Sequence, residues 1–429
     1  MPIKDRKTAD SYYEASRNLN IDAAMVDGDL SGDVVVIGGG LTGSSTALNL
    51  AKSGVDVILL EAEHFGWGAS GRSGGQIING YAAEQDTLEE LVGMETAREL
   101  WEHSLGAVEY TRQLIFEYNI DCDLKMGYLH VGVKPKQAQE LEQWAEHLSR
   151  VYGYEDMTFL ERDSLRTRLA SERYSGGVFD AGSGHLHPLN YCLGVVRAAR
   201  DAGARLYERS SVDRITSDSR GKIVHCAKGT IRCDQVVYAC NAYLDGLEPE
   251  IGKKSMPVGT YIVATEPLSE SQALSLIPQR EAVADTNFVL DYFRLSKDNR
   301  MLFGGRVSYS TLQPLKLTES LKKRMKNVFP QLGNTKIEFS WGGYVSITIN
   351  RAPHIGQLDH GIWYAQGFSG HGMALSGYVG KLLSEAITVD RERIACFEKI
   401  PHKRFPGGSW LRTPALVAAM SYYKLKDYL

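Results

Sequence analysis

Short apolar runs separated by glycine mark the first recognisable unit of the chain. Residues 33–37 (DVVVI) form a continuous run of β-branched residues, and residues 55–60 form a second apolar run. Between them, residues 42–53 suit a helix that Gly54 ends. Continuous apolar runs are typical of parallel strands that are buried on both faces. The pattern therefore predicts a βαβ unit with a right-handed crossover.

Amphipathic periodicity predicts helices elsewhere in the chain. Apolar residues recur at helical spacing, with charged residues between them, over 87–118 and 136–152. Shorter helices are expected over 190–202, 318–329 and 373–387. We expect two short strands at 222–226 and 230–232, and then a buried run at 235–240 that returns the chain to the first sheet.

The region from residue 257 to residue 348 reads mostly as strands. Apolar residues alternate there with polar or aromatic ones, and only one predicted helix interrupts the pattern. This alternation predicts an antiparallel sheet that caps a ligand cavity. A chain of 429 residues is also long for one domain, so two interleaved domains are expected.

Composition and charge favour a small-molecule partner. The chain has 48 basic and 52 acidic residues, a formal charge of -4, and no long run of like charge, which argues against nucleic-acid binding. The six cysteines include no C-x-x-C pair, so we predict buried thiols in a reducing compartment and no metal site. No apolar segment long enough for an integral membrane span appears, and a cytoplasmic protein is expected.

A glycine motif follows the first predicted strand and opens the first predicted helix. Gly38 permits a tight turn, Gly40 lets the backbone approach a pyrophosphate, and Gly43 allows close packing of helix and strand. Thr42 lies in the same first turn of the helix, and Glu61, at the end of the second strand, suits a ribose hydroxyl. The motif predicts a bound dinucleotide and leaves NAD and FAD open.

A second glycine-rich stretch, GWGASGRSGGQ at residues 66–76, follows Glu61. Such a stretch presents successive backbone N–H groups without bulky side chains, and it suits a long ligand that needs donors along its whole length. FAD needs such donors, whereas NAD does not. The predicted cofactor residues here are Gly68, Ser70, Gly71, Arg72, Ser73, Gly74, Gly75 and Gln76.

These two motifs together resemble the N-terminal signature of the D-amino-acid-oxidase-like flavoprotein superfamily. GFSGHGM at 367–373 resembles the C-terminal flavin motif of the sarcosine oxidases in that superfamily. The resemblance implies FAD contacts from Gly370, His371, Gly372 and Met373, and weaker ones from Asn241 and from Val212 beside the adenine. A helix that begins there would stabilise negative charge at the pyrimidine end of a flavin.

The resemblance implies an α/β fold, α+β overall: a Rossmann-type FAD-binding domain with a discontinuous antiparallel-sheet substrate domain. We predict an FAD-binding domain over 1–85, 175–250 and 345–400, a substrate domain over 86–174 and 251–344, and a C-terminal tail over 401–429.

Within the superfamily, the chain most resembles the bacterial γ-glutamylputrescine oxidases. The matching segments run along nearly the whole chain: SGRSGGQ, ERYSGG, GHLHPLN, CNAYL, KKSMPVGT, LDYFRLSKDNRMLFGG, QGFSGHGM and IPHKRFPGG. This implies oxidation of an amine by hydride transfer to FAD, with imine hydrolysis and formation of H2O2 from O2. Ala374 replaces a lysine of the sarcosine oxidases, and the stretch around Tyr344 lacks the substrate-binding arginine of the glycine oxidases, which argues against a short α-amino acid.

The resemblance also implies noncovalent FAD, because residues 341–365 contain no cysteine and Ser70 and Gly71 stand where a histidine-linked branch attaches its flavin. The aromatic residues of the cavity sheet, half of which must face the core, suit an aliphatic amine: Tyr261, Phe288, Tyr292, Phe293, Trp341 and Tyr344. Of these, Tyr292, Trp341 and Tyr344, together with Arg351, are the predicted substrate contacts; His371, Arg306 and Tyr261 are the predicted catalytic residues.

Two other functions remain open. One is oxidation or dehydrogenation of a cyclic secondary amino acid such as pipecolate or proline, and the other, less favoured by the charge, is flavin-dependent RNA modification. The oligomeric state is also left open by the sequence.

Overall fold

The computed structural model of the protein describes residues 10–405 except 245, 288, 309–315 and 360. Phe288 and most of the predicted tail, residues 406–429, lie outside the described residues, and so do the side chains of residues 306–308.

The first sheet has six strands and contains the predicted βαβ unit. Its order is β18–β19–β12–β2–β3–β8; β18 is antiparallel to β19, and the other neighbours are parallel. The strands are β2 (Val34–Ile37), β3 (Val57–Leu60), β8 (Arg205–Tyr207), β12 (Gln235–Tyr238), β18 (His354–Asp359) and β19 (Ile362–Gln366). All residues of β2 and β3 are buried, and α2 (Leu41–Lys52) connects them, which confirms the prediction.

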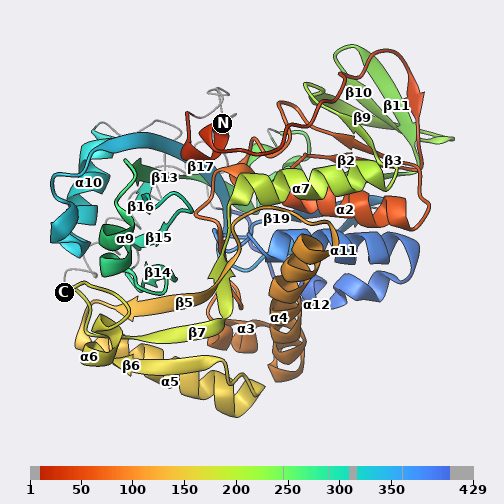
Figure 1. Ribbon diagram of the computed structural model, residues 1–429. Helices are drawn as coiled ribbons and strands as arrows, with labels where there is room; N and C mark the ends of the chain where they lie inside the picture. Colours follow the sequence, from red (N-terminus) through yellow and green to blue (C-terminus); the bar gives the residue numbers. More distant parts are fainter. Residues whose placement is uncertain (1–9, 245, 288, 309–315, 360, 406–429) are drawn as a thin grey trace.

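Both faces of this sheet are covered. On one face, Val34 and Val36 pack with residues of α2, α4 (Met94–Glu117), α7 (Pro188–Asp201) and α11 (Leu375–Thr388). On the other face, Val35 and Ile37 pack against a four-stranded sheet of order β1–β11–β10–β9. Its strands are β1 (Leu30–Ser31), β9 (Val212–Asp218), β10 (Gly221–Cys226) and β11 (Gly229–Cys233). Figure 1 shows the layers in order, with β10 and β11 at the top, then β2 and β3, then α7 and α2.

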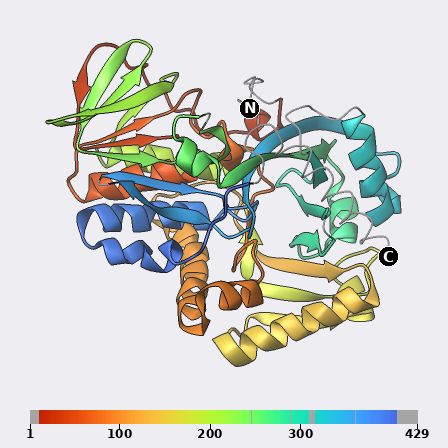
Figure 2. The ribbon, with the colours of Figure 1, turned by 180° about the vertical axis from the view of Figure 1, so that it is seen from behind.

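The second large sheet has nine strands and is mostly antiparallel, as the alternation predicts. Eight strands follow the order β17–β13–β16–β15–β14–β5–β7–β4, and β6 pairs with β7; only β14 and β5 are parallel. The strands are β4 (Gln76–Ile77), β5 (Lys125–Gly132), β6 (Met157–Glu161), β7 (Gly176–His185), β13 (Ser255–Thr265), β14 (Ala282–Asp285), β15 (Tyr292–Leu295), β16 (Met301–Ser308) and β17 (Ile337–Thr348). Figures 1 and 2 show this sheet beside the first one, so the two form the two halves of the molecule.

The remaining helices flank the sheets. They are α1 (Tyr12–Ala15), α3 (Gln85–Val92), α5 (Pro135–Tyr152), α6 (Arg162–Arg166), α8 (Pro249–Gly252), α9 (Glu270–Leu276), α10 (Leu317–Val328) and α12 (Ala395–Glu398). The single helix predicted over 87–118 is wrong in one respect, because Gly93 has a φ of 79° and divides it into α3 and α4. None of the helices in the described part of the chain has both the length and the apolar composition that crossing a bilayer requires.

All six cysteines are free, and four of them are buried, which agrees with the predicted buried thiols. One group of residues among those described has the geometry of metal ligands: the ligand atoms of Glu99, His103 and Cys396 lie within 4.8 Å of one another. None of the three lines the cavity described below.

Candidate active site

A large cavity of about 1810 Å³ takes its lining from both large sheets. Its walls come from segments far apart in the chain: the turn after β2, the glycine-rich stretch 66–76, the residues after β12, the ends of β13 and β17, and the loop before α11. A space of this size accommodates a dinucleotide together with a second small molecule.

Three glycines shape the turn between β2 and α2. Gly38 has a φ of 112°, and a Cβ atom there would lie 2.6 Å from the carbonyl oxygen of Ala239. A Cβ on Gly43 would lie 1.9 Å from the carbonyl oxygen of Gly38, and one on Gly40 would lie 2.8 Å from Ser70 Oγ. Gly40 and Thr42 line the cavity, so the N-terminus of a 12-residue helix faces it.

Glu61 closes the other side of this turn. Its Oε2 accepts a hydrogen bond from the Gly39 N–H at 2.7 Å, and its Oε1 accepts one from the Glu63 N–H at 2.9 Å. Burial raises the pKa of Glu61, and these two N–H groups act in the opposite direction. Each carboxylate oxygen keeps a second lone pair for a ribose hydroxyl. The carboxylate is therefore fixed before any ligand arrives.

The glycine-rich stretch forms a wall of bare backbone. A Cβ on Gly71 would lie 2.2 Å from the carbonyl oxygen of Gly66, and one on Gly75, whose φ is 72°, would lie 2.1 Å from that of Leu186. Ser70 Oγ accepts from the Leu41 N–H at 3.0 Å and ties the stretch to the start of α2. All predicted residues of this stretch except Gly71 line the cavity. Gly71, like Gly43, lies outside the lining and instead allows two backbone segments to pack closely.

Arg72 and two tryptophans hold the middle of the stretch. The Arg72 guanidinium lies 4.2 Å from the centroid of the Trp67 ring, and the Arg72 carbonyl accepts a hydrogen bond from Trp341 Nε1 at 3.0 Å. Trp67 Nε1 is buried, has no hydrogen-bond partner in the described part of the chain, and belongs to a residue that lines the cavity. A buried donor beside the cavity is available to a ligand that carries oxygen or nitrogen acceptors.

Trp341→Phe is expected to destabilise the protein by about 2 kcal/mol, because phenylalanine keeps much of the ring but loses the donor to Arg72. The ring packs 5.2 Å from that of Tyr13 and is only 3% exposed. Trp363→Phe is the matched control, since Trp363 Nε1 also donates a single hydrogen bond, to Gln235 at 2.8 Å. Urea unfolding should show a similar loss of unfolding free energy for both variants, while only Trp341→Phe should also retain less FAD after purification. If both variants retain the same amount of FAD, the bond from Trp341 to Arg72 does not support the cavity.

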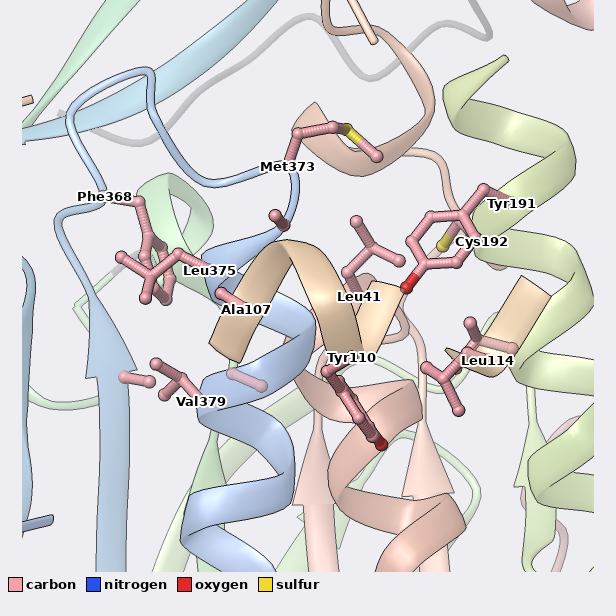
Figure 3. Packing of buried hydrophobic residues seen from close by; sticks show 14 of the residues in the cluster. Leu41, Ala107, Tyr110, Leu114, Tyr191, Cys192, Phe368, Met373, Leu375 and Val379 are labelled. Atoms are coloured by element: carbon pink, nitrogen blue, oxygen red, sulfur yellow. The ribbon is translucent and has the colours of Figure 1, made fainter. Parts of the chain in front are cut away.

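The GFSGHGM loop between β19 and α11 presents His371 to the same cavity. Its backbone turns through left-handed conformations at Gly367, Ser369 and Gly370, with φ values of 74°, 54° and 92°. Gly370, His371, Gly372 and Met373 all line the cavity. Figure 3 shows Phe368, Leu375 and Val379 packed along the start of α11, in the same hydrophobic cluster as Leu41 of α2. One core thus positions the two helix N-termini that meet at the cavity.

His371 is held by backbone. Its Nε2 lies 3.1 Å from the carbonyl oxygen of Ile78 and 3.1 Å from that of Asn79. Burial, and next the charge of Arg351, lower the pKa of the ring. The imidazole is therefore neutral near pH 7.

The predicted substrate and catalytic residues divide into three groups. Tyr292, Tyr344 and Arg351 line the cavity. Tyr261 and Trp341 do not: Tyr261 lies in the core on the opposite face of β13, and Trp341 is covered by Tyr13 and Arg72. Arg306 lies in β16 opposite Tyr261, and its side chain lies outside the described part of the chain. The remaining predicted cofactor residues, Val212 and Asn241, line the cavity, and Asn241 Oδ1 accepts from the Gly367 N–H at 3.2 Å.

Two residues at the site are absent from our sequence predictions. Arg294, in YFRLS, is 3% exposed, and it donates to the carbonyl oxygens of Gly74 at 2.8 Å and Leu186 at 2.9 Å. His130, in YLHVG, lines the cavity with its ring 4.6 Å from that of Tyr128, and burial lowers its pKa to about 3. In both cases one ionisable residue inside an apolar strand is the signal that could have identified it.

Comparisons with known proteins agree on one family. The model of the family described as FAD dependent oxidoreductase (DAO) matches residues 33–386. The chain is 42% identical over 420 residues to a γ-glutamylputrescine oxidoreductase of Escherichia coli, with 98% of each chain covered. It is 39% identical to a probable oxidoreductase, OrdL, of Haemophilus influenzae, with 97% of each covered. The crystal structure of glycine oxidase from Geobacillus kaustophilus shares the fold, with a TM-score of 0.69 at 23% identity over 83% of this chain and 94% of that one.

Proposed function

The chain belongs to the DAO family of FAD-dependent oxidoreductases, and we propose that the amine it oxidises is γ-glutamylputrescine or a closely related polyamine derivative. The observation that carries this proposal is the 42% identity to the E. coli relative, which extends over 98% of both chains. Substrate-binding and cofactor-binding segments are both included in so complete a match.

The cavity fits FAD on three independent features. It has glycines at 38, 40 and 75 where a Cβ would overlap neighbouring atoms, two helix N-termini that face the same space, and the Trp67 donor, which has no partner among the described residues. We propose that Glu61 holds the ribose, that the turn from Gly38 to Thr42 holds the pyrophosphate, and that the start of α11 faces the pyrimidine ring.

We propose that FAD is bound without a covalent link, because residues 341–365 contain no cysteine. Acid precipitation should then release all of the flavin into the supernatant. We also place the enzyme in the cytoplasm, because a reducing compartment suits six free cysteines.

When bound, FAD would supply the redox chemistry: acceptance of a hydride from the carbon beside the amine and delivery of two electrons to O2 to give H2O2; the imine product would hydrolyse in water. The protein must orient the amine and keep the reacting carbon dry. The position of Tyr292 supports this role, since its ring lies beside Gly74 and the residue lines the cavity. Tyr344 lines the same cavity and lies edge-on to Tyr243, with the ring centroids 6.2 Å apart.

Anaerobic mixing of the holoenzyme with candidate substrates tests the function. γ-Glutamylputrescine should bleach the visible flavin absorbance much faster than sarcosine does, and putrescine should be intermediate. Bleaching by pipecolate alone would replace this function by the cyclic amino acid alternative.

Glu61→Gln is expected to raise the dissociation constant of FAD about tenfold or more, because the neutral amide offers one acceptor oxygen and loses the charge-assisted bond. Fluorescence titration of the apoprotein with FAD measures the constant. Glu208→Gln is the matched control, since Glu208 also accepts from a backbone N–H, that of Phe65 at 2.8 Å, and does not line the cavity. An equal effect of both variants would show that Glu61 supports only the fold.

A further inference from the structure

The two carbonyl contacts of His371 fix its tautomer. Carbonyl oxygens accept hydrogen bonds and never donate them, so Nε2, which lies 3.1 Å from the oxygens of both Ile78 and Asn79, must carry the proton. Nδ1 of the neutral ring therefore carries a lone pair. The backbone just after the glycine-rich stretch thus determines which nitrogen of His371 is the acceptor.

The Nδ1 atom of His371 is accessible, and the residue lines the cavity. Nδ1 has no hydrogen-bond partner within the described residues, and it is not among the side-chain atoms that are buried without a partner. His371 lines the cavity together with Tyr292 and His130. An accessible acceptor on a rigidly held ring is a place for a donor on the substrate.

The charged and titratable groups around the ring leave it neutral. Arg351, on the turn after β17, lowers its pKa, and the carbonyls of Ile78 and Asn79 act in the opposite direction more weakly than burial does. His130, on β5, is the other imidazole near it; with a pKa of about 3 it is uncharged. The phenols of Tyr128 and Tyr292 have raised pKa values and also stay uncharged. No carboxylate is among the groups that shift the pKa of His371. Asp285 lines the same cavity, and burial raises its pKa to about 7, so this carboxyl group titrates near neutral pH.

We propose that Nδ1 of His371 accepts a hydrogen bond from the ammonium group of the substrate and then takes its proton, so that the amine is neutral when its carbon is oxidised. This step rests on the proposed amine oxidation and names the group that prepares the substrate for it. One N–H bond of the ammonium breaks, one Nδ1–H bond forms, and the positive charge moves from the substrate to the imidazole. The ammonium also loses solvation in the cavity, which brings the proton affinities of the two groups closer together.

His371→Gln separates this role from a structural one. The glutamine amide nitrogen can occupy the place of Nε2 and keep the donation to Ile78 and Asn79, whereas nothing replaces Nδ1. At pH 7 the ratio of the flavin-reduction rate constant to the substrate dissociation constant should fall about 100-fold. The variant can use only substrate that is already deprotonated in solution. The ratio should therefore rise about tenfold per pH unit up to a substrate pKa of about 10. In the wild type it should stay flat from about pH 7 to 9, and fall only below the lowered pKa of the ring.

Calorimetry gives a readout that needs no turnover. tert-Butylamine has no hydrogen on the carbon beside nitrogen and cannot be oxidised, so its binding can be followed in buffers of different ionisation enthalpy at pH 8. The wild type should release no proton to the buffer, while His371→Gln should release about one, since it binds the neutral amine. His103→Gln is the control: His103 is a half-buried histidine outside the cavity, bonded to Tyr378, and should behave as wild type.

The possible results are distinct. If no amine bleaches the flavin, the proposed function is wrong. If amines bleach it but the wild-type profile already rises tenfold per pH unit, or if His371→Gln leaves the profile and the proton count unchanged, then the amine function stands and the role of His371 is wrong.

Discussion

Gly43→Ala is expected to yield protein without FAD. The added Cβ would lie 1.9 Å from the Gly38 carbonyl oxygen and 3.3 Å from Ala239 Cβ. The first turn of α2 would therefore have to move away from the turn that contains Gly38. This overlap is with backbone and cannot be relieved by rotation of a side chain. We expect a loss of about 3 kcal/mol in stability and of the pyrophosphate site, so the purified variant should lack the visible flavin spectrum.

Gly377→Ala is the matched control. Gly377 is also a glycine within a helix beside the cavity, but only Tyr191 Oη, at 3.7 Å, lies near the position of its Cβ. Because alanine is the better helix former by about 1 kcal/mol, this variant should hold FAD and melt at the wild-type temperature or above it. A Gly43→Ala protein with full FAD content would show that the close approach of α2 to Gly38 is not required.

Arg294→Met should cost about 4 kcal/mol of unfolding free energy and most of the bound FAD. The substitution leaves the buried carbonyl oxygens of Gly74 and Leu186 without donors, at about 1–3 kcal/mol each, and also removes the contact with Tyr13 Oη at 3.2 Å. Since Gly74 lines the cavity, the loss of its hydrogen bond should also disturb the cavity wall. Urea unfolding of apoprotein and holoprotein, with FAD content measured separately, distinguishes the two effects.

Arg232→Met provides the comparison for a surface arginine. Arg232 pairs with Asp218 at 2.9 Å on the four-stranded sheet, where both side chains are about a third exposed, and solvent screening leaves such a surface pair with little effect on stability. If Arg294→Met were no more harmful than Arg232→Met, the buried guanidinium would not be what supports the glycine-rich stretch.

The parts of the fold that the sequence predicts well are those specified by local patterns. Continuous apolar runs identify β2 and β3, and the glycine spacing places the turn between them, because both depend on neighbours along the chain. The periodicity predicts one helix over 87–118 because apolar residues, Val92 and Met94, flank Gly93 and continue the pattern. A hydrophobic pattern alone does not show that the direction of the helix axis changes. The strands β9, β10 and β11 pair with their neighbours along the chain, but the pairing of β11 with β1 depends on contacts between residues about 200 positions apart, as between Leu30 and Ile231.

For the candidate site, sequence reasoning located backbone better than side chains. Glycine is required where a Cβ would collide with neighbouring backbone, as at Gly38 and Gly75. The presence of glycine in the sequence therefore already indicates where the backbone packs closely. Strand alternation separates two faces but does not say which one meets the cavity, and Tyr261 lies on the face away from it. Trp341 is on the cavity face, but Tyr13 from a distant helix covers it, which no pattern within 257–348 reveals.

The dispersed origin of the cavity wall has a consequence for synthesis in the cell. The wall begins at Ile37 and needs the loop through Met373, while strands from residues between them complete the two sheets. Contacts of such long sequence separation form late in folding. A ribosome-bound chain that ends before the loop at 367–373 lacks one side of the cavity. We therefore expect FAD to load only after near-complete translation, so that the cofactor does not stabilise the nascent chain.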